Sequence, residues 1–260
     1  MSRRRGTWVR GAALLVAAAA GCTAQDPQPQ SQPEPAATAG FMMRYEEPAT
    51  ASDRAGRDVL RDGGTAERAL AELNALLDLP HPVAVVARSC GGEGTGYDPA
   101  THRIELCYDD LAEEREPFAR VGDPRPDERL AEVVRETVHH EAGHAVLDAL
   151  RLPAEGDRAE EDAADGFARL MLLRGGPEGE AALLTAARSY DLAAAADPVP
   201  DPEDEHAPPA DRAEAHRCAV LGEAPDRHQD LATPARAHCP ATWSRTRTAW
   251  TRNLTPLLRP

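Results

Sequence analysis

Hydrophobic positions along this chain recur mostly at the spacing of helices, and the first clear run lies near residue 70. In the stretch TAERALAELNALLDLP, four leucines fall on one face of a helix and Pro80 ends the run. Thr65 stands where an N-cap residue is expected. The pattern therefore predicts a helix that begins at Thr65 and ends before Pro80.

Two segments that follow this helix have the pattern of strands. The segment PVAVVARSC is almost continuously apolar, which is typical of a buried strand, and RIELCY alternates Ile104 and Leu106 with charged residues. The stretch between them, GGEGTGYDPATH, is rich in turn-forming residues. We therefore expect the two strands to pair as a disulfide-stapled hairpin, cross-linked between Cys90 and Cys107.

The rest of the chain, from Asp127 onwards, has helical periodicity almost throughout. Asp127 can cap a helix that runs to about Leu150, because Asp is a favoured N-cap residue. Trp243 and Trp250 lie seven residues apart on one helical face, which indicates core positions. Further helices are expected at 157–173, 178–196, 211–221 and 242–254. Together these elements predict an α+β fold that is mainly helical, with a small sheet.

The N-terminal region lacks this periodicity and divides into two parts. MSRRRGTWVR is basic and GAALLVAAAAG is a short apolar run, so residues 1–21 are predicted to be a signal peptide. Small residues directly before Cys22 resemble a bacterial lipoprotein cleavage site, and an ordinary secretory signal is the alternative. Residues 22–52 begin rich in Pro and Gln and are predicted to be a disordered tether, with the folded domain at 53–260. We expect an exported protein, anchored by a lipid on Cys22 to the outer face of the bacterial cell membrane, or secreted.

The charge balance restricts the partners. The chain has 29 Lys and Arg against 44 Asp and Glu among 260 residues, a formal net charge of −15. Nucleic-acid binding requires a basic surface, so we expect no nucleic acid as a partner.

Export also changes the interpretation of the cysteines. Apart from Cys22 there are four, Cys90, Cys107, Cys218 and Cys239, and an even count in an exported protein suggests two disulfides. Of the three possible pairings we favour the sequence-local one, Cys90–Cys107 and Cys218–Cys239. A four-cysteine zinc site is the rival interpretation, but no pair has the close spacing of a zinc knuckle.

The strongest candidate for chemistry is HEAGH at 140–144, within one predicted helix. His140 and His144 are four residues apart and share a face, so two imidazoles from one turn could bind zinc. Glu141, beside them, could take a proton from a zinc-activated water. His139 has no partner at this spacing. Gly143 weakens a helix, which makes sense if another segment approaches the backbone there.

A catalytic zinc site needs a third protein ligand and one open position. Glu161 and Asp165 are again four residues apart on the next predicted helix. This arrangement resembles the gluzincins, the thermolysin-like class, and the resemblance implies Glu161 as a zinc ligand and Asp165 as the hydrogen-bond partner of His140. From the residues alone, Asp165 or Asp162 could be the ligand instead, or the acids could simply favour the start of a helix.

The chain as a whole is similar to a metallopeptidase family of bacterial exported proteins and lipoproteins. The matching stretches include SCGGEGTGYDPATHRIELCYDDL, VVRETVHHEAGHAVLDALRLP and EEDAADGFARLMLL, within about 70–255. The resemblance implies a zincin-like fold and zinc peptidase activity, without a known substrate. This chain departs from the family pattern at Gly94–Gly96 and Pro208–Asp211.

Peptide hydrolysis also needs a donor for the negative charge that develops on the carbonyl oxygen. His206 is the first choice, with Tyr97 or Arg212 as reserves, whereas His216 is expected at the surface. The edge of the small sheet could bind an extended peptide by strand addition. The sequence thus favours an exported zinc metallopeptidase that acts on a peptide or protein substrate, with Glu141 as general base.

Two other classes of protein are alternatives to an exported zinc metallopeptidase. A non-catalytic exported lipoprotein could use the same residues as a structural or vestigial zinc site and act as a binding module. A membrane protease of the AAA type also carries HEAGH, but this sequence has no phosphate-binding loop.

Overall fold

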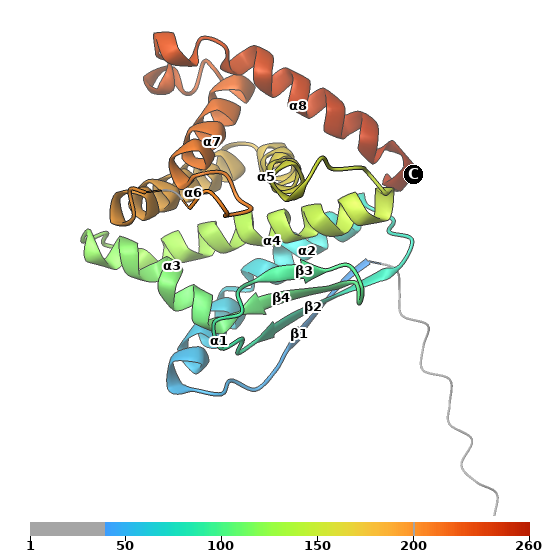
Figure 1. Cartoon of the computed structure of the whole chain (residues 1–260), viewed down its shortest axis with the longest axis vertical. Coiled ribbons are helices and arrows are strands. Elements are labelled where there is room, and N and C mark those ends of the chain that lie inside the picture. The colour runs from blue at the N-terminus through green and yellow to red at the C-terminus, as the bar shows by residue number, and fades with distance from the viewer. Residues whose placement is uncertain (1–39, 200) are drawn as a thin grey trace, which may run out of the picture. The chain divides into compact units, whose positions relative to one another are not determined.

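The computed structural model describes residues 40–199 and 201–260 (Figure 1). The predicted signal peptide and the lipidation residue Cys22 lie outside the described residues, as does the predicted tether up to residue 39.

The predicted end of the tether at residue 52 is wrong. Strand β1 (Gly40–Tyr45) and the start of helix α1 (Ala51–Gly63) both precede the expected domain boundary. Thr50 caps α1 in a capping box with Asp53, so the helix has a clear local start signal. β1 lacks such a signal because its stabilising partner is a distant strand, β2 (Pro82–Arg88), with which it pairs in parallel.

Four strands form one sheet in the order β1-β2-β4-β3. β3 (Gly96–Asp98) lies at one edge and is antiparallel to β4 (Arg103–Cys107), whereas β2 and β4 are parallel. The predicted hairpin between the segments that form β2 and β4 is therefore wrong, because the hairpin joins β3 and β4. The turn-rich stretch contains the third strand, so the chain reverses once into β3 and again into β4.

Both predicted disulfides are present, with the sequence-local pairing. Cys90–Cys107 joins the segment after β2 to the last residue of β4, and Cys218–Cys239 joins helix α7 (Pro209–Glu223) to the first residue of helix α8 (Cys239–Leu254). All four cysteines are thus bonded to one another, which excludes the four-cysteine zinc site.

The long helices follow the predicted order, with two additions. The helix expected from Thr65 is present, and Pro126 rather than Asp127 begins the helix that carries HEAGH. Helices α1 and α3 were not predicted. The remaining bounds are α2 (Thr65–Leu76), α3 (Tyr108–Arg120), α4 (Pro126–Leu150), α5 (Asp157–Arg174) and α6 (Pro177–Ala196).

Helix α4 lies between the sheet and the C-terminal helices α5 to α8 (Figure 1). Its middle is buried on nearly every side, and this buried part includes five polar residues: Glu136, His139, His140, Glu141 and His144. Buried polar groups are costly without partners, so the neighbouring elements must supply them. The fold therefore concentrates polar contacts around the centre of α4.

The last helix completes the core. Trp243 and Trp250 on α8 are both buried, as their spacing predicted, and Trp250 meets the edge of Phe167 with 5.2 Å between ring centroids. Within the described ranges, none of the helices has the length and apolar character that a membrane span requires.

Candidate active site

Helix α4 holds His140, Glu141 and His144 with exposed fractions of 4%, 6% and 9%. The Nε2 atoms of the two histidines face each other at 3.2 Å. His139 lies apart from them, because its Nδ1 is 2.7 Å from the carbonyl oxygen of Arg135. The structure thus forms the predicted histidine pair and leaves His139 out.

Gly143 allows helix α5 to cross α4 closely. A Cβ atom at this position would lie 3.0 Å from Cα and 3.1 Å from the carbonyl oxygen of Ala164 on α5. Contacts this short with backbone atoms are tighter than ordinary packing, so a side chain at this position would push α5 away from α4. The glycine therefore permits the approach that brings the acidic residues of α5 opposite the histidines.

Glu161 on α5 reaches both histidines. Its Oε2 is 2.9 Å from His140 Nε2 and its Oε1 is 3.3 Å from His144 Nε2. One ligand atom from each of these three residues lies within 4.8 Å of the other two. The structure therefore brings together the three residues predicted to bind zinc.

Two further carboxylates orient the imidazoles. Asp165 Oδ1 is 2.9 Å from His140 Nδ1, and Glu160 Oε1 is 3.2 Å from His144 Nδ1. A proton on each Nδ1 leaves a lone pair on each Nε2, so both lone pairs point at the Glu161 carboxylate and at each other. Such a group of acceptors requires a cation between them. The role of Glu160 was missed, because only the packing of α5 against α4 places it beside His144.

The geometry fits a zinc ion. Zinc–nitrogen distances of about 2.0–2.1 Å in a tetrahedral site place two ligand nitrogens about 3.3 Å apart. The observed separation of the two Nε2 atoms is 3.2 Å. Two imidazoles and one carboxylate also form a donor set that catalytic zinc sites use, with a fourth position left open. His140, His144 and Glu161 are therefore the residues that would hold the ion.

The electrostatics of the cluster also demand positive charge. Burial acts to lower the pKa of His140, but hydrogen bonds with Asp165 and Glu161 outweigh it and raise the pKa to about 10. Burial acts to raise the pKa of Glu161, yet its contacts with His140, His144 and His206 hold that pKa far below its usual value. Without a metal ion the cluster keeps a proton in its place.

Glu141 is placed to accept a proton. Its carboxylate is buried, and its Oε2 makes no hydrogen bond with any of the described residues. Burial raises the pKa of Glu141, although the neighbouring histidines oppose this shift. A carboxylate with a raised pKa and a free oxygen has the properties of a general base.

His206 reaches the cluster from the loop before α7. Its Nε2 is 3.0 Å from Glu161 Oε2, and its ring centroid is 5.8 Å from that of His140. Arg158 holds this loop by donating to the carbonyl oxygens of Asp204 and Glu205 at 3.0 and 2.9 Å. The hydrogen bond to Glu161 raises the pKa of His206, which favours its charged, donating form.

The two reserve candidates occupy different places. Tyr97 lines the same cavity, and its hydroxyl donates to Asp148 at 2.8 Å. Arg212 instead lies behind the site, where it donates to both oxygens of Asp165 at 2.7 and 3.0 Å and stacks over Tyr190. Arg212 therefore supports Asp165 and does not face the cavity, and no local pattern in the sequence indicated this pair.

One turn before His140, a second buried network was also missed. Glu136 contacts His216 Nε2 at 3.2 Å and accepts a hydrogen bond from the Tyr190 hydroxyl at 3.3 Å. The prediction that His216 lies at the surface is wrong, because its exposed fraction is 0%. Glu136 and His216 are 80 residues apart, and only the packing of α7 near α4 brings them together.

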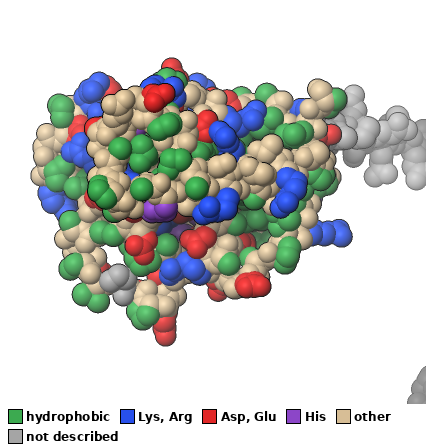
Figure 2. All heavy atoms as spheres, turned by 90° about the horizontal axis from the view of Figure 1, so that it is seen from above, with side chains coloured by type: hydrophobic (Ala, Val, Ile, Leu, Met, Phe, Trp, Pro, Cys, Tyr) green, Lys and Arg blue, Asp and Glu red, His purple; other side chains and the backbone are tan. Residues whose placement is uncertain are grey.

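The cluster opens into a cavity of about 260 Å³ lined by residues of β3, α4, α5 and the His206 loop. Figure 2 shows histidine side chains partly visible in a hollow on one face of the molecule, with acidic and basic side chains around it. The reactive groups of the cluster are thus open to a substrate.

Comparison with known proteins gives one match. Residues 45–254 match a family described as "Putative metallopeptidase", and this range includes α1 to α8 and β2 to β4 but only the last residue of β1. No curated protein and no solved structure matches the chain. Since the matched range covers well over half of the sequence, the chain belongs to this metallopeptidase family.

Proposed function

We propose that this protein is a zinc-dependent peptidase with a zincin-like catalytic domain. The observation that carries the proposal is the convergence of His140 Nε2, His144 Nε2 and the Glu161 carboxylate beside the unpartnered oxygen of Glu141. Membership of a metallopeptidase family agrees with a metal ion at these residues.

Glu141 would act as the general base. A zinc ion held by His140, His144 and Glu161 would supply Lewis acidity, lowering the pKa of a water molecule and polarising the scissile carbonyl. The Glu141 carboxylate takes a proton from the attacking water and then donates it to the leaving amine. Burial raises the pKa of Glu141, which favours its accepting the proton from water.

His206 would stabilise the negative charge that develops on the carbonyl oxygen. It lies in the same cavity, and its raised pKa favours a charged imidazolium donor. Substrate binding has to release its Nε2 from Glu161, to which it is 3.0 Å away. The loop from Asp204 to His206 therefore adjusts when substrate and metal are both present.

An extended peptide would bind along strand β3. This strand is at the edge of the sheet, and among the described strands it pairs only with β4. Gly96 and Tyr97 of β3 also line the cavity that contains His140 and Glu141. Strand addition at this edge would therefore place a peptide carbonyl beside the proposed zinc ligands.

We also propose export and membrane attachment. The basic and apolar pattern of residues 1–21 and the small residues before Cys22 support a lipid anchor on the outer face of a bacterial membrane. The two disulfides agree with maturation in an oxidising compartment.

The Glu141→Gln variant tests the catalytic proposal against a non-catalytic zinc site. We expect the purified protein to contain about one zinc per chain and to cleave peptides from an unbiased library identified by mass spectrometry. Glu141→Gln should keep the zinc and lose cleavage, because all three ligands remain. Stoichiometric zinc without cleavage in the unaltered protein would favour the binding-module alternative. No zinc in either protein would reject the zinc-dependent peptidase and leave a binding module with a vestigial site.

A further inference from the structure

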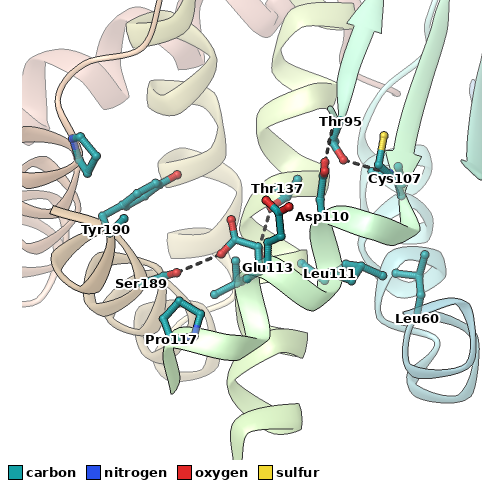
Figure 3. Close-up of a pocket in the computed structure, with 16 residues that line it drawn as sticks. Leu60, Thr95, Cys107, Asp110, Leu111, Glu113, Pro117, Thr137, Ser189 and Tyr190 are labelled. Atoms are coloured by element: carbon teal, nitrogen blue, oxygen red, sulfur yellow. Dashed lines mark hydrogen bonds between the residues drawn. The ribbon is translucent and has the colours of Figure 1, made fainter. Parts of the chain in front are cut away.

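Helices α3, α4 and α6 enclose most of a second cavity, with a volume of about 370 Å³ (Figure 3). In the close-up, Asp110 and Glu113 extend from α3 into the space between the helices, while Ser189 and Tyr190 approach from α6. A volume of this size is sufficient for a single large side chain or a small ligand.

This second cavity adjoins the candidate active site. Thr95 lines both cavities, and on α4 the second cavity is lined by Thr137, one turn before Glu141. One turn of helix rises by about 5.4 Å, and consecutive Cα atoms of a peptide are about 3.8 Å apart, so a long side chain on a neighbouring substrate residue can span one turn. When a scissile carbonyl lies at Glu141, the side chain of an adjacent substrate residue can therefore enter the second cavity.

The walls of the second cavity are mostly apolar. Side chains from α1, β4, α3, α4 and α6 supply this surface, which suits a substrate side chain with a long hydrocarbon part. The apolar lining residues are chiefly Leu60, Leu106, Leu111, Val133, Val134 and Ala193.

The charged lining residues are all acidic. They are Asp110, Glu113 and Glu114, and none of the lining residues is an arginine or a lysine. Glu113 is exposed at the cavity rim and makes no hydrogen bond or ion pair within the described residues, whereas the partly buried Glu114 accepts only the Ser189 hydroxyl, at 3.0 Å. The nearby Arg212 is already held by Asp165. None of the three carboxylates is thus paired with a cation within the described residues.

Burial also makes the negative charge of Glu114 unfavourable. It raises the pKa of Glu114, and the charges of Glu136 and Asp110 raise it further, although Ser189 and Arg212 oppose the shift. A cation that entered the cavity would offset this cost, whereas a neutral side chain would not. The combination of apolar walls and unpaired carboxylates matches the stem and the charged end of a basic side chain.

We propose that the second cavity binds a lysine or arginine side chain of the substrate residue next to the scissile bond. The hydrocarbon stem lies against the apolar walls and the cationic end lies at Glu113 and Glu114. The position of this residue next to the cleaved bond rests on the proposed peptidase function, whereas binding of the basic side chain does not.

Binding to a protein that cannot cleave tests the pocket separately from catalysis. The probes are three fluorescent peptide pools with arginine, norleucine or glutamate fixed between randomised apolar residues, and binding to zinc-loaded Glu141→Gln protein is followed by fluorescence anisotropy. We expect the arginine pool to bind at least about tenfold more tightly than the norleucine pool. Equal binding of these two pools would overturn the proposal.

Matched variants identify the carboxylates responsible. Combining Glu113→Gln and Glu114→Gln in the same background should remove the arginine preference. Combining Glu116→Gln and Glu128→Gln, which removes an equal charge from exposed positions that do not line the cavity, should keep it. Glu113→Lys alone should shift the preference towards the glutamate pool, which provides a test if the double variant does not fold. A preference that survives both changes would also overturn the proposal, since it would come from the net negative charge.

Cleavage of the same pools by protein with Glu141 intact completes the experiment. Faster cleavage of the arginine pool, with cuts beside the fixed arginine, supports both proposals. Arginine-selective binding without cleavage of any pool supports the pocket and rejects the peptidase function. Cleavage of all pools at equal rates supports the peptidase function and rejects the pocket.

Discussion

Asp165 connects three helices through one carboxylate, so its replacement by asparagine has two separable effects. The carboxylate accepts from His140 Nδ1 on α4 and from two nitrogens of Arg212 on α7. An asparagine side chain has one acceptor oxygen, and its amide group would face a second donor. Asp165→Asn should therefore weaken both the orientation of His140 and the pairing of Arg212.

The first effect concerns folding and does not depend on zinc. Arg212 and Asp165 have side chains that are only 13% and 5% exposed. Breaking a buried ion pair by removing one partner costs about 3–5 kcal/mol, because the other charge stays buried without compensation. We expect the free energy of unfolding, measured by urea denaturation in the presence of a chelator, to fall by about this amount.

The second effect concerns zinc affinity. Loss of a carboxylate behind a metal-binding histidine lowers metal affinity by about 10–100-fold. Each factor of ten removes about 1.4 kcal/mol from the stabilisation that saturating zinc provides. The difference between the unfolding free energies with and without zinc should therefore shrink by about 1–3 kcal/mol in Asp165→Asn.

The control for both effects is Asp162→Asn, an exposed position on the same helix. It should change neither the unfolding free energy nor the zinc affinity by more than about 0.5 kcal/mol. The reasoning is refuted if Asp165→Asn binds zinc as tightly as the unaltered protein. It is also refuted if the loss of stability with chelator is no larger than in Asp162→Asn.

Three further predictions concern other parts of the fold. Burial lowers the pKa of His139 from 6.5 to about 4, so the unfolded chain binds more protons between these values. The contribution of His139 to stability should thus fall as the pH falls below 6.5, by about 2 kcal/mol at pH 5, so urea titrations of His139→Asn should differ from those of the unaltered protein by this amount. Equal pH dependence of the two proteins would contradict this prediction. Replacing both Cys90 and Cys107 by Ser should cost about 3 kcal/mol, and an unchanged thermal midpoint would count against this value. Gly143→Val should destabilise the protein by about 1–3 kcal/mol and weaken zinc binding, because its side chain would separate α5 from α4 at Ala164; retention of both properties would disprove the close-contact argument.

The parts of the site that were predictable from sequence are local. His140 and His144 are one turn apart on one helix, and the same spacing relates Glu161 and Asp165 on the next. The two side chains of each pair lie on one face of their helix whatever the tertiary structure. The sequence therefore left only the packing of the two helices against each other undetermined. Gly143 was a further local sign of that packing.

The missed features all depend on partners distant in the sequence. The Arg212–Asp165 pair spans 47 residues and the His216–Glu136 contact spans 80. The parallel pairing of β2 with β4 was missed for a related reason, because hydrophobic alternation defines the faces of a strand and not the direction of its neighbour. β1 was assigned to the tether because its pairing with β2 cannot be read from its own six residues.

The edge strand β3 has only three residues, Gly96 to Asp98. At about 3.3 Å per residue it offers roughly 10 Å of backbone for pairing. Long, flat edges allow identical chains to add to one another and aggregate, and very short edges are one way in which proteins avoid this. β3 is therefore long enough to hold a few residues of a peptide beside Glu141, and too short to nucleate the stacking of one copy of this chain on another.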